Sequence, residues 1–303
     1  MAKKTKSRRR AAFEAGAIRA LVTWPRILPF RLRCALAAWL MAWVVAPAAG
    51  YRARIRANLA HVMPELPERE VRRLMRRVPA NVGRMLTELA AGEEFAERLR
   101  DAPVTGPGLA ALEEARAAGR PQLLVSGHFG NFDAMRAVLS RRGYRIGAIY
   151  RPLNDKMLDA EFLAMLSAIS EPVFARGRSG LAKMIRHLRQ GNAVAILPDQ
   201  HVNKGALLSF FGKPAPTALS AAEMALKYDA VLVPLYGIRQ PDGSFELVIE
   251  EPVPHSDART MTQALNDSLE ARIRQNMDQW LWLHRRWKPE RQARRAARKA
   301  AGG

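Results

Sequence analysis

The chain has little cysteine, few acidic residues and only one extended apolar segment. Its single cysteine, Cys34, excludes an internal disulfide framework and a cysteine-rich zinc site, and is typical of a reducing, cytosol-facing compartment. With 49 % hydrophobic and 25 % charged residues over 303 positions, the composition excludes a disordered chain, a collagen-like repeat and a polytopic membrane protein. The length is sufficient for one large domain or two small ones.

Basic residues dominate the charge. There are 49 Lys and Arg against 28 Asp and Glu, a formal net charge of +21, which indicates polyanionic surroundings such as nucleic acid, an anionic membrane face or an acidic protein. Much of the excess lies in residues 1–10 and 285–299, so we separate a basic N-terminal region, 1–33, and a basic C-terminal tail, 291–303, from the body. No RNA- or DNA-binding motif accompanies these ends, and we expect no nucleic-acid partner.

Residues 34–50 form the apolar segment, 17 residues without a charge. Arginines flank it on both sides, and Trp39 and Trp43 lie one helical turn apart. Its length is at the lower limit of what crosses a bilayer, for which about 20 residues are typical. It could be a secretory signal with a cleavage site imitated by Ala46-Pro47-Ala48, a helix of the protein core, or a membrane anchor that spans the bilayer or lies in its interface. The flanking arginines favour an anchor whose two ends both touch the cytoplasmic leaflet.

The body of the chain changes pattern near residue 100. Residues 53–100 are predicted to be helical, with breaks at Pro64 and Pro67. Beyond them, short apolar runs predict buried strands at 122–126, 145–150, 193–197 and 230–236. Helix-period stretches follow these runs, at 133–142, 156–169, 179–190, 217–228 and 260–284. This alternation predicts an α/β fold with a mixed, mostly parallel sheet flanked by helices, in one catalytic domain of residues 51–290, to which 245–250 could add an antiparallel edge strand.

The segment that follows the first predicted strand, SGHFGNFD at 126–133, carries the strongest candidate for chemistry. Open α/β sheets place their sites at the carboxyl ends of strands, where His128 lies. Asp133, at the start of the next helix, could orient the imidazole and raise its basicity, so that it removes a proton from a hydroxyl. The chain has no Gly-x-Ser-x-Gly elbow and no cysteine near this pair, which indicates that a second substrate is the nucleophile. On spacing alone, a structural role for the two residues is also open, because a histidine and an aspartate five positions apart are common.

Six blocks of the sequence resemble, in order, motifs of the bacterial late lipid A acyltransferases, the lauroyl/myristoyl family within the glycerolipid acyltransferase superfamily. The first is His128-x4-Asp133, which resembles the family's His-x4-Asp/Glu motif. The other five are Tyr150-Arg151-Pro152-Leu153-Asn154, Arg176-Gly177, Leu197-Pro198-Asp199-Gln200, Phe210-Phe211-Gly212 with Ala215 and Thr217, and the tryptophan-rich residues 279–288. The resemblance covers roughly residues 25–290.

The resemblance implies transfer of a fatty acyl chain from an acyl carrier protein thioester to a hydroxyl of a lipid A precursor. His128 is then the general base and Asp133 its acidic partner, one methylene shorter than the Glu of many members. Four further residues are expected to line the substrate site: Arg151, Arg176, Asp199 and Asn131. Arg151 suits a phosphate of the acceptor or of the carrier's phosphopantetheine arm.

The same reasoning sets expectations for the surroundings of the enzyme. No histidine has metal-ligand spacing such as HExxH, so we expect no metal and no cofactor beyond the acyl carrier protein as co-substrate. The expected partners are that carrier, the lipid A precursor and anionic lipids at the cytoplasmic face of a bacterial inner membrane. A glycerophospholipid or another glycolipid is the alternative acceptor. The tryptophans 280, 282 and 287 could lie at the membrane interface or in the core, and Phe210 and Phe211 could line an acyl pocket or the core.

Overall fold

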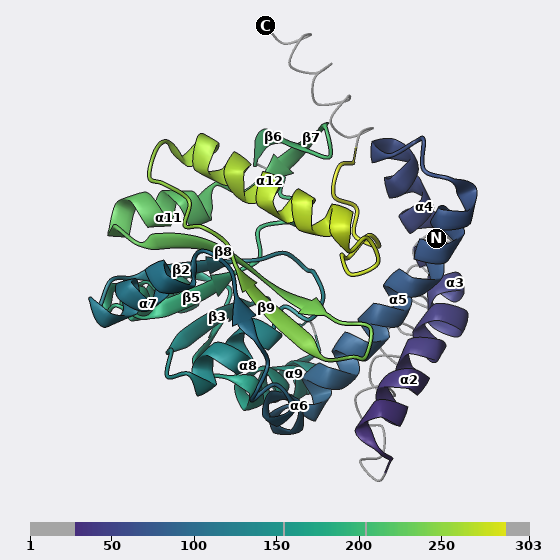
Figure 1. The fold of residues 1–303 in the computed structure, drawn as a ribbon, viewed down its shortest axis with the longest axis horizontal. Coiled ribbons are helices and arrows are strands. Elements are labelled where there is room, and N and C mark those ends of the chain that lie inside the picture. Colours follow the sequence, from purple (N-terminus) through teal and green to yellow (C-terminus); the bar gives the residue numbers. More distant parts are fainter. Residues whose placement is uncertain (1–27, 154, 204, 289–303) are drawn as a thin grey trace, which may run out of the picture.

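A computed structural model describes residues 28–153, 155–203 and 205–288. The basic segments 1–10 and 291–303, and Asn154 of the Tyr150–Asn154 block, lie outside the described residues. Two layers of helices enclose a central β-sheet, and a group of helices from the N-terminal third lies along one side of the molecule (Figure 1).

The central sheet has seven strands in the order β1-β9-β8-β2-β5-β3-β4. Their bounds are β1 Val104–Thr105, β2 Gln122–Val125, β3 Ile146–Tyr150, β4 Val173–Ala175, β5 Ala193–Ile196, β8 Val231–Arg239 and β9 Phe245–Ile249. Strands β2, β3, β4, β5 and β8 are parallel to one another, and β9 pairs antiparallel with β8. The expected mixed, mostly parallel sheet is confirmed, although β9 is not an edge strand, because β1 pairs with its other side.

Successive side chains of the central strands face opposite helical layers, as the pleat of a strand requires. On β2, Leu123 and Val125 join one apolar core, and Leu124 joins the other. The layers are α10 Arg178–Arg189, α11 Ser220–Tyr228 and α12 Ala258–Gln275 on one face, and α6 Glu93–Arg98, α7 Leu109–Ala117, α8 Ala134–Arg141 and α9 Lys156–Ile169 on the other. Burial on both faces explains why a continuous apolar run, and not an alternating one, marks this strand.

The apolar segment near the N-terminus is one continuous helical stretch from Phe30 to Ala48. It comprises α2 Phe30–Leu40, a π-helical turn Met41–Val45 and α3 Ala46–Ala48. With 19 residues and a mean hydropathy of 1.3, it is long and apolar enough to cross a membrane. One side packs along α5 Glu68–Ala91, where Gly83 permits the approach, since a Cβ there would lie 2.4 Å from the carbonyl oxygen of Ala37. The other side leaves four large apolar side chains exposed: Leu32, Trp39, Trp43 and Val44.

The arginines that flank this stretch bind protein groups. Arg33 is buried and pairs with Glu94, and Arg52 donates to the carbonyl oxygen of Ala42 at 2.6 Å. In α4, Tyr51–Val62, the guanidinium of Arg56 pairs with Glu68 at the start of α5. Arg33 is therefore held inside the protein by an ion pair, and the expectation that both ends of the segment touch the cytoplasmic leaflet stays a prediction.

The C-terminal part departs from the predicted long helix. Helix α12 ends at Gln275, and the residues after it form an irregular segment that crosses the carboxyl ends of the strands. Trp280, Trp282 and Trp287 are 1 %, 0 % and 1 % exposed, so they belong to the core and not to a membrane interface. A continuing helix would point Trp280 and Trp282 in opposite directions, because successive helical positions differ by about 100°. The irregular backbone lets all three indoles enter one cluster.

This aromatic cluster also holds the hairpin of β6, Ala206–Phe210, and β7, Lys213–Thr217, in place. The Phe210 ring lies 5.5 Å from the ring of Trp280 and 5.9 Å from that of Trp287. Phe211 packs 5.4 Å from Trp282. Of the two expectations for Phe210 and Phe211, the core position is confirmed.

Candidate active site

His128 lies just beyond the carboxyl end of β2, and Asp199 lies three residues beyond the end of the neighbouring parallel strand β5. The Nδ1 atom of His128 is 2.7 Å from Oδ1 of Asp199, and the backbone N–H of His128 donates to Oδ2 at 2.8 Å. The indole Nε1–H of Trp280 donates to the same Oδ2 at 2.9 Å. Three donors thus hold one buried carboxylate against the imidazole.

The environment of Asp199 keeps this carboxyl ionised. Burial alone would raise its pKa, but the charge and the hydrogen bonds of His128, together with the Trp280 hydrogen bond, lower the pKa of Asp199 to about 2. Because an ionised carboxylate only accepts hydrogen bonds, Nδ1 of His128 is the donor in this contact. The proton on Nδ1 leaves the lone pair of Nε2 available as a base.

The Nε2 atom of His128 contacts a second side chain of the site. The side-chain amide of Gln200, the residue after Asp199, lies 3.1 Å from it and donates to its lone pair. The imidazole is 22 % exposed, whereas the Asp199 side chain is 3 % exposed. A substrate hydroxyl that replaces the Gln200 amide would find a hydrogen-bond acceptor already oriented by a buried acid.

Asp133, the acid expected to assist His128, has a different partner. Its carboxylate binds the guanidinium of Arg136 at 2.6 Å, and both side chains are buried in α8 and its first turn. Arg136 also donates to the carbonyl oxygens of Leu166 and Ser170. The expectation of a His128–Asp133 pair is therefore wrong in this structure, because the start of α8 directs Asp133 along its own helix toward Arg136.

Asn131 supports the turn that carries His128 and does not project into an open site. Its Oδ1 accepts the backbone N–H of Asp133 at 3.0 Å, and its amide donates to Oε2 of Glu88 at 2.9 Å. Glu88, on α5, is buried and also forms a two-pronged ion pair with Arg239 at the end of β8. The turn that carries His128 is thus tied to α5 and to β8 by one buried polar network.

The tryptophan-rich segment completes the turn from the other side. The backbone N–H of Gly130 donates to the carbonyl oxygen of Gln279 at 2.9 Å. The backbone N–H of Leu281 donates to the carbonyl oxygen of His128 at 3.0 Å. Gly130 has φ of +56°, and a Cβ on it would lie 2.2 Å from the carbonyl oxygen of Gly237. Glycine at this position is required for both reasons. The segment therefore fixes the backbone of His128 as well as its acid.

A small apolar pocket of about 80 Å³ opens beside the His128 ring. Val78, Val82 and Met85 of α5 form one wall. Phe132 also lines the pocket, with its ring 5.2 Å from the imidazole, as do Trp280 and Leu281. An apolar chain bound here would reach the base directly.

Arg151 and Arg176 follow β3 and β4, at the same carboxyl edge as His128. Both are exposed, and the backbone N–H of Arg176 donates to the carbonyl oxygen of Tyr150 at 2.7 Å. In the part of the chain that the structure describes, neither side chain hydrogen-bonds to the His128–Asp199 pair. Strand β3 is two positions from β2 in the sheet, and β4 three, so these arginines border the site at its rim.

The second histidine near the acid is not a competing base. Burial lowers the pKa of His284 to about 4, so it is neutral at neutral pH. Its Nε2 accepts the backbone N–H of His201 at 3.1 Å. Arg286 nearby is fully buried, and burial lowers its pKa to about 10 while it donates to Thr217 Oγ1 at 2.6 Å. These residues hold the C-terminal segment on the β6–β7 hairpin.

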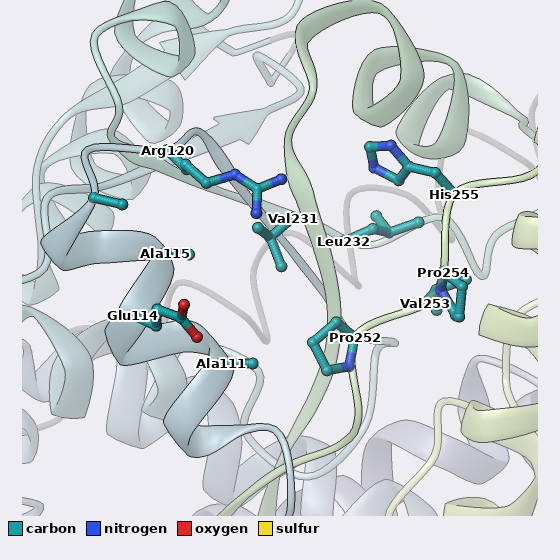
Figure 2. A pocket seen from close by; sticks show the side chains of 11 residues that line it. Ala111, Glu114, Ala115, Arg120, Val231, Leu232, Pro252, Val253, Pro254 and His255 are labelled. Atoms are coloured by element: carbon teal, nitrogen blue, oxygen red, sulfur yellow. The ribbon is translucent and has the colours of Figure 1, made fainter.

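A larger cavity, of about 340 Å³, lies at the opposite end of the strands (Figure 2). Val231 and Leu232 at the start of β8 line it together with Glu114 and Arg120 at α7 and with His255. The His128–Asp199 pair lies at the other ends of these parallel strands. The cavity in Figure 2 is therefore separate from the candidate active site. Among the described residues, no group of three or more His, Cys, Asp or Glu could hold a metal ion.

Comparison with known proteins identifies the group to which this site belongs. A family model described as bacterial lipid A biosynthesis acyltransferase matches residues 2–289. The chain belongs to this family. A lipid A biosynthesis lauroyltransferase of Escherichia coli is 26 % identical to it over 281 residues, which cover 90 % of this chain and 89 % of the relative. A lipid A biosynthesis acyltransferase of Haemophilus influenzae is 24 % identical over 263 residues, with coverage of 84 % and 81 %. The chain is thus an O-acyltransferase with an acceptor of the lipid A type.

A more distant relative uses a different acceptor. A phosphatidylinositol mannoside acyltransferase of Mycobacterium tuberculosis is 24 % identical over 185 residues, or 59 % of this chain and 58 % of the relative.

Four residues that the structure places in or beside the candidate site were not predicted from the sequence: Gln200, Trp280, Glu88 and Arg239. Gln200 and Trp280 lie inside blocks that resemble the family. The motifs therefore pointed to these positions but did not show which atoms they contact. Glu88 and Arg239 lie on α5 and β8, 151 positions apart, and only packing brings them together.

The Trp280 hydrogen bond to Asp199 can be tested by substitution. Trp280→Phe keeps most of the buried ring but removes the N–H that binds a charged carboxylate, so we expect the free energy of unfolding to fall by about 1.5–3 kcal/mol. Trp282→Phe is the matched control, because its Nε1–H donates to a neutral acceptor, the carbonyl oxygen of Met277, at 2.7 Å. Urea unfolding of the two variants in the same detergent measures both free energies of unfolding. An equal loss of unfolding free energy in the two variants would show that the hydrogen bond to Asp199 stabilises the fold no more than one to a neutral carbonyl oxygen.

Proposed function

We propose that this enzyme transfers a fatty acyl chain from an acyl carrier protein thioester to a hydroxyl of a lipid A precursor. The main support for the proposal is the His128–Asp199 pair at the carboxyl edge of the sheet, with His128 lining an apolar pocket. Family membership supports the acceptor class. A thioester donor reacts directly with an acceptor hydroxyl once a base accepts the hydroxyl proton, so the proposal needs no nucleophile from the protein.

In the proposed mechanism, Nε2 of His128 accepts the proton of the acceptor hydroxyl as its oxygen attacks the thioester carbonyl carbon. Asp199 stabilises the imidazolium that forms, through the Nδ1 hydrogen bond. When the tetrahedral intermediate collapses, the carbon–sulfur bond breaks and the proton on Nε2 passes to the thiolate of the carrier. The products are the ester and the free thiol, and His128 returns to its neutral form. A positioned base of this kind typically contributes about 10²–10⁴-fold to the rate.

The surrounding residues suit the two substrates. The pocket lined by Val78, Val82 and Met85 would hold the end of the acyl chain next to the thioester. We assign Arg151 and Arg176, exposed at the rim, to phosphate groups of the acceptor or of the phosphopantetheine arm, because a guanidinium binds phosphate through two parallel hydrogen bonds. The net charge of +21 favours an acidic carrier and an anionic lipid surface.

We further propose that the stretch from Phe30 to Ala48 anchors the enzyme in the interface of the cytoplasmic leaflet of the inner membrane. A helix that crossed the bilayer would bring the arginines of α5 with it, since α5 packs along it, and charged side chains are costly in hydrocarbon. Arg52 and Arg76 lie over the Trp43 ring, at 5.4 and 5.5 Å from its centre. Indole and guanidinium groups together are typical of the level of lipid head groups.

Membrane binding by this surface is testable. Trp39 and Trp43 are 58 % and 50 % exposed, so Trp39→Ala with Trp43→Ala removes apolar area that would be buried in lipid. We expect the partition coefficient onto vesicles with anionic lipid to fall at least about tenfold. A Leu207→Ala variant is the control, since Leu207 is 52 % exposed but lies on β6, remote in sequence from this helix. Unchanged partitioning of the double variant would contradict this anchor.

The proposed reaction is tested with the purified full chain, acyl carrier proteins loaded with different acyl chains, and a defined lipid A precursor. We expect the precursor to gain one ester-linked acyl chain in the mass spectrum. Acyl-coenzyme A replaces the carrier in a parallel reaction, and a mannosylated glycolipid replaces the acceptor. Transfer only from acyl-coenzyme A would overturn the donor assignment. Transfer only to the glycolipid would favour the second acceptor class, which the name of the mycobacterial relative contains.

A further inference from the structure

A third cavity lies next to the apolar stretch from Phe30 to Ala48, apart from the pocket beside His128. It has a volume of about 380 Å³ and lies between α2, α5, α6 and the turn that joins β8 to β9. Four arginines line it, together with two acidic residues: Arg31, Arg84, Arg98, Arg239, Glu88 and Asp242. The ionisable groups of the lining therefore carry an excess of two positive charges.

The arginines of this cavity are not all neutralised by the protein. Glu88 is occupied, since Arg239 binds both of its oxygens and Asn131 donates to one of them. Arg84 donates to the neutral Oδ1 of Asn81 at 2.9 Å, and among the described residues no carboxylate forms an ion pair with it. Burial, and then the charge of Arg239, lower the pKa of Arg84, while the charge of Glu88 acts in the opposite direction. The buried Nε of Arg239 also has no hydrogen-bond partner in the described residues.

The position of the cavity relates it to both the membrane and the catalytic turn. The lining includes Phe30, Arg31 and Ala35, which belong to the N-terminal end of the apolar helix. The cavity therefore lies directly beside that end of the helix. On its inner side, Arg239 binds Glu88 and Glu88 binds Asn131, three residues after His128. A group held here would lie beside the chain of contacts that positions the base.

We propose that this arginine cavity binds the phosphate of a lipid headgroup, and that it does so to position the acceptor lipid for acylation. Phosphate is the anion that a guanidinium binds through two parallel hydrogen bonds, and several arginines around one cavity can share its oxygens. A headgroup attached to acyl chains in the leaflet reaches the cavity without leaving the membrane surface. The inference that the phosphate belongs to the acceptor rests on the proposed function, whereas phosphate binding itself does not.

The test uses Arg84→Gln and Arg31→Gln in the full chain. Arg84→Gln removes the partly buried charge, and Arg31→Gln removes an exposed charge that the fold does not require. Arg69→Gln is the matched control, because Arg69 also lies on α5 but its side chain is 90 % exposed and does not line the cavity. Binding is measured by flotation with phosphatidylcholine vesicles that carry phosphorylated acceptor, dephosphorylated acceptor, or dephosphorylated acceptor with phosphatidylglycerol. KM for each acceptor is measured in the same vesicles.

With the phosphorylated acceptor we expect Arg84→Gln to raise the dissociation constant and KM at least about tenfold. Arg31→Gln should act in the same direction, and Arg69→Gln should stay near wild type. When the acceptor has no phosphate, the dissociation constant and KM of each variant should approach those of the wild type. A defect that returns only with phosphatidylglycerol would assign the phosphate to a bilayer phospholipid. Equal binding by wild type and both variants in all vesicles, or the same defect in Arg69→Gln, would overturn the site. A wild-type protein that binds phosphorylated lipid but acylates no acceptor would refute the proposed function and leave the phosphate site standing.

Discussion

Replacing Asp199 by asparagine is expected to lower kcat by about 10²–10⁴-fold while the protein stays folded. Asparagine has nearly the same shape and can still accept the N–H groups of His128 and Trp280. It cannot stabilise an imidazolium by charge, and its amide can donate to Nδ1, which would place the proton of the imidazole on Nε2. The base would then lack its lone pair at the atom that faces the substrate. Steady-state kinetics with carrier-bound donor and lipid A precursor measure the change.

His128→Ala is the reference for this variant and should lose at least as much activity. Circular dichroism and vesicle binding of both variants should match wild type, because neither residue contributes to the membrane helix. A kcat of Asp199→Asn within threefold of wild type would refute the assignment of Asp199 as the acid that orients His128.

Asp199 also makes a pH-dependent contribution to stability. Its pKa in the folded protein, about 2, is below the ordinary value of 3.8, so the ionised form favours the folded state. This stabilisation is complete above the unfolded pKa and is lost as the pH falls through the interval between the two values. The stability difference between wild type and Asp199→Asn should therefore shrink from about pH 4 toward about pH 2. Urea unfolding at a series of pH values gives this difference, and a difference independent of pH would contradict the lowered pKa.

Replacing Asp133 by asparagine is expected to lower the free energy of unfolding by about 3–5 kcal/mol. The substitution leaves the guanidinium of Arg136 buried at the centre of the molecule without its carboxylate. The carbonyl oxygens of Leu166 and Ser170 still accept hydrogen bonds from Arg136, but they do not cancel its charge. Urea unfolding of the purified variant measures the loss.

Removing both charges separates this structural role from a catalytic one. Asp133→Leu combined with Arg136→Met should be less destabilised than Asp133→Asn alone, since no uncompensated charge remains. At a temperature where Asp133→Asn is folded, its kcat per folded molecule should fall less than that of Asp199→Asn. If Asp133→Asn were stable and had a larger catalytic defect than Asp199→Asn, Asp133 would be the acidic partner of His128, as the family motif implies.

The sequence predicted the strands of the sheet closely. The runs at 122–126, 145–150, 193–197 and 230–236 correspond to β2, β3, β5 and β8, because strands covered on both faces are uniformly apolar. The short strands β1 and β4 and the hairpin β6–β7 were not predicted. The hairpin includes Pro214 and Pro216, and such residues weaken any strand signal in the sequence.

The sequence alone determined the position of His128 after a strand, the α/β order of elements and the apolar segment near the N-terminus. These features are local: a strand end followed by histidine, or an uncharged helical run, is complete within a few residues. The tertiary structure decided which carboxylate contacts His128. Asp133 and Asp199 were both named as site residues, but only the pairing of β2 with β5 brings position 199, 71 residues away, to Nδ1 of His128. It likewise placed three tryptophans in the core and arranged four arginines around one cavity. Distances across a sheet depend on strand order and register, which spacing along the chain does not encode.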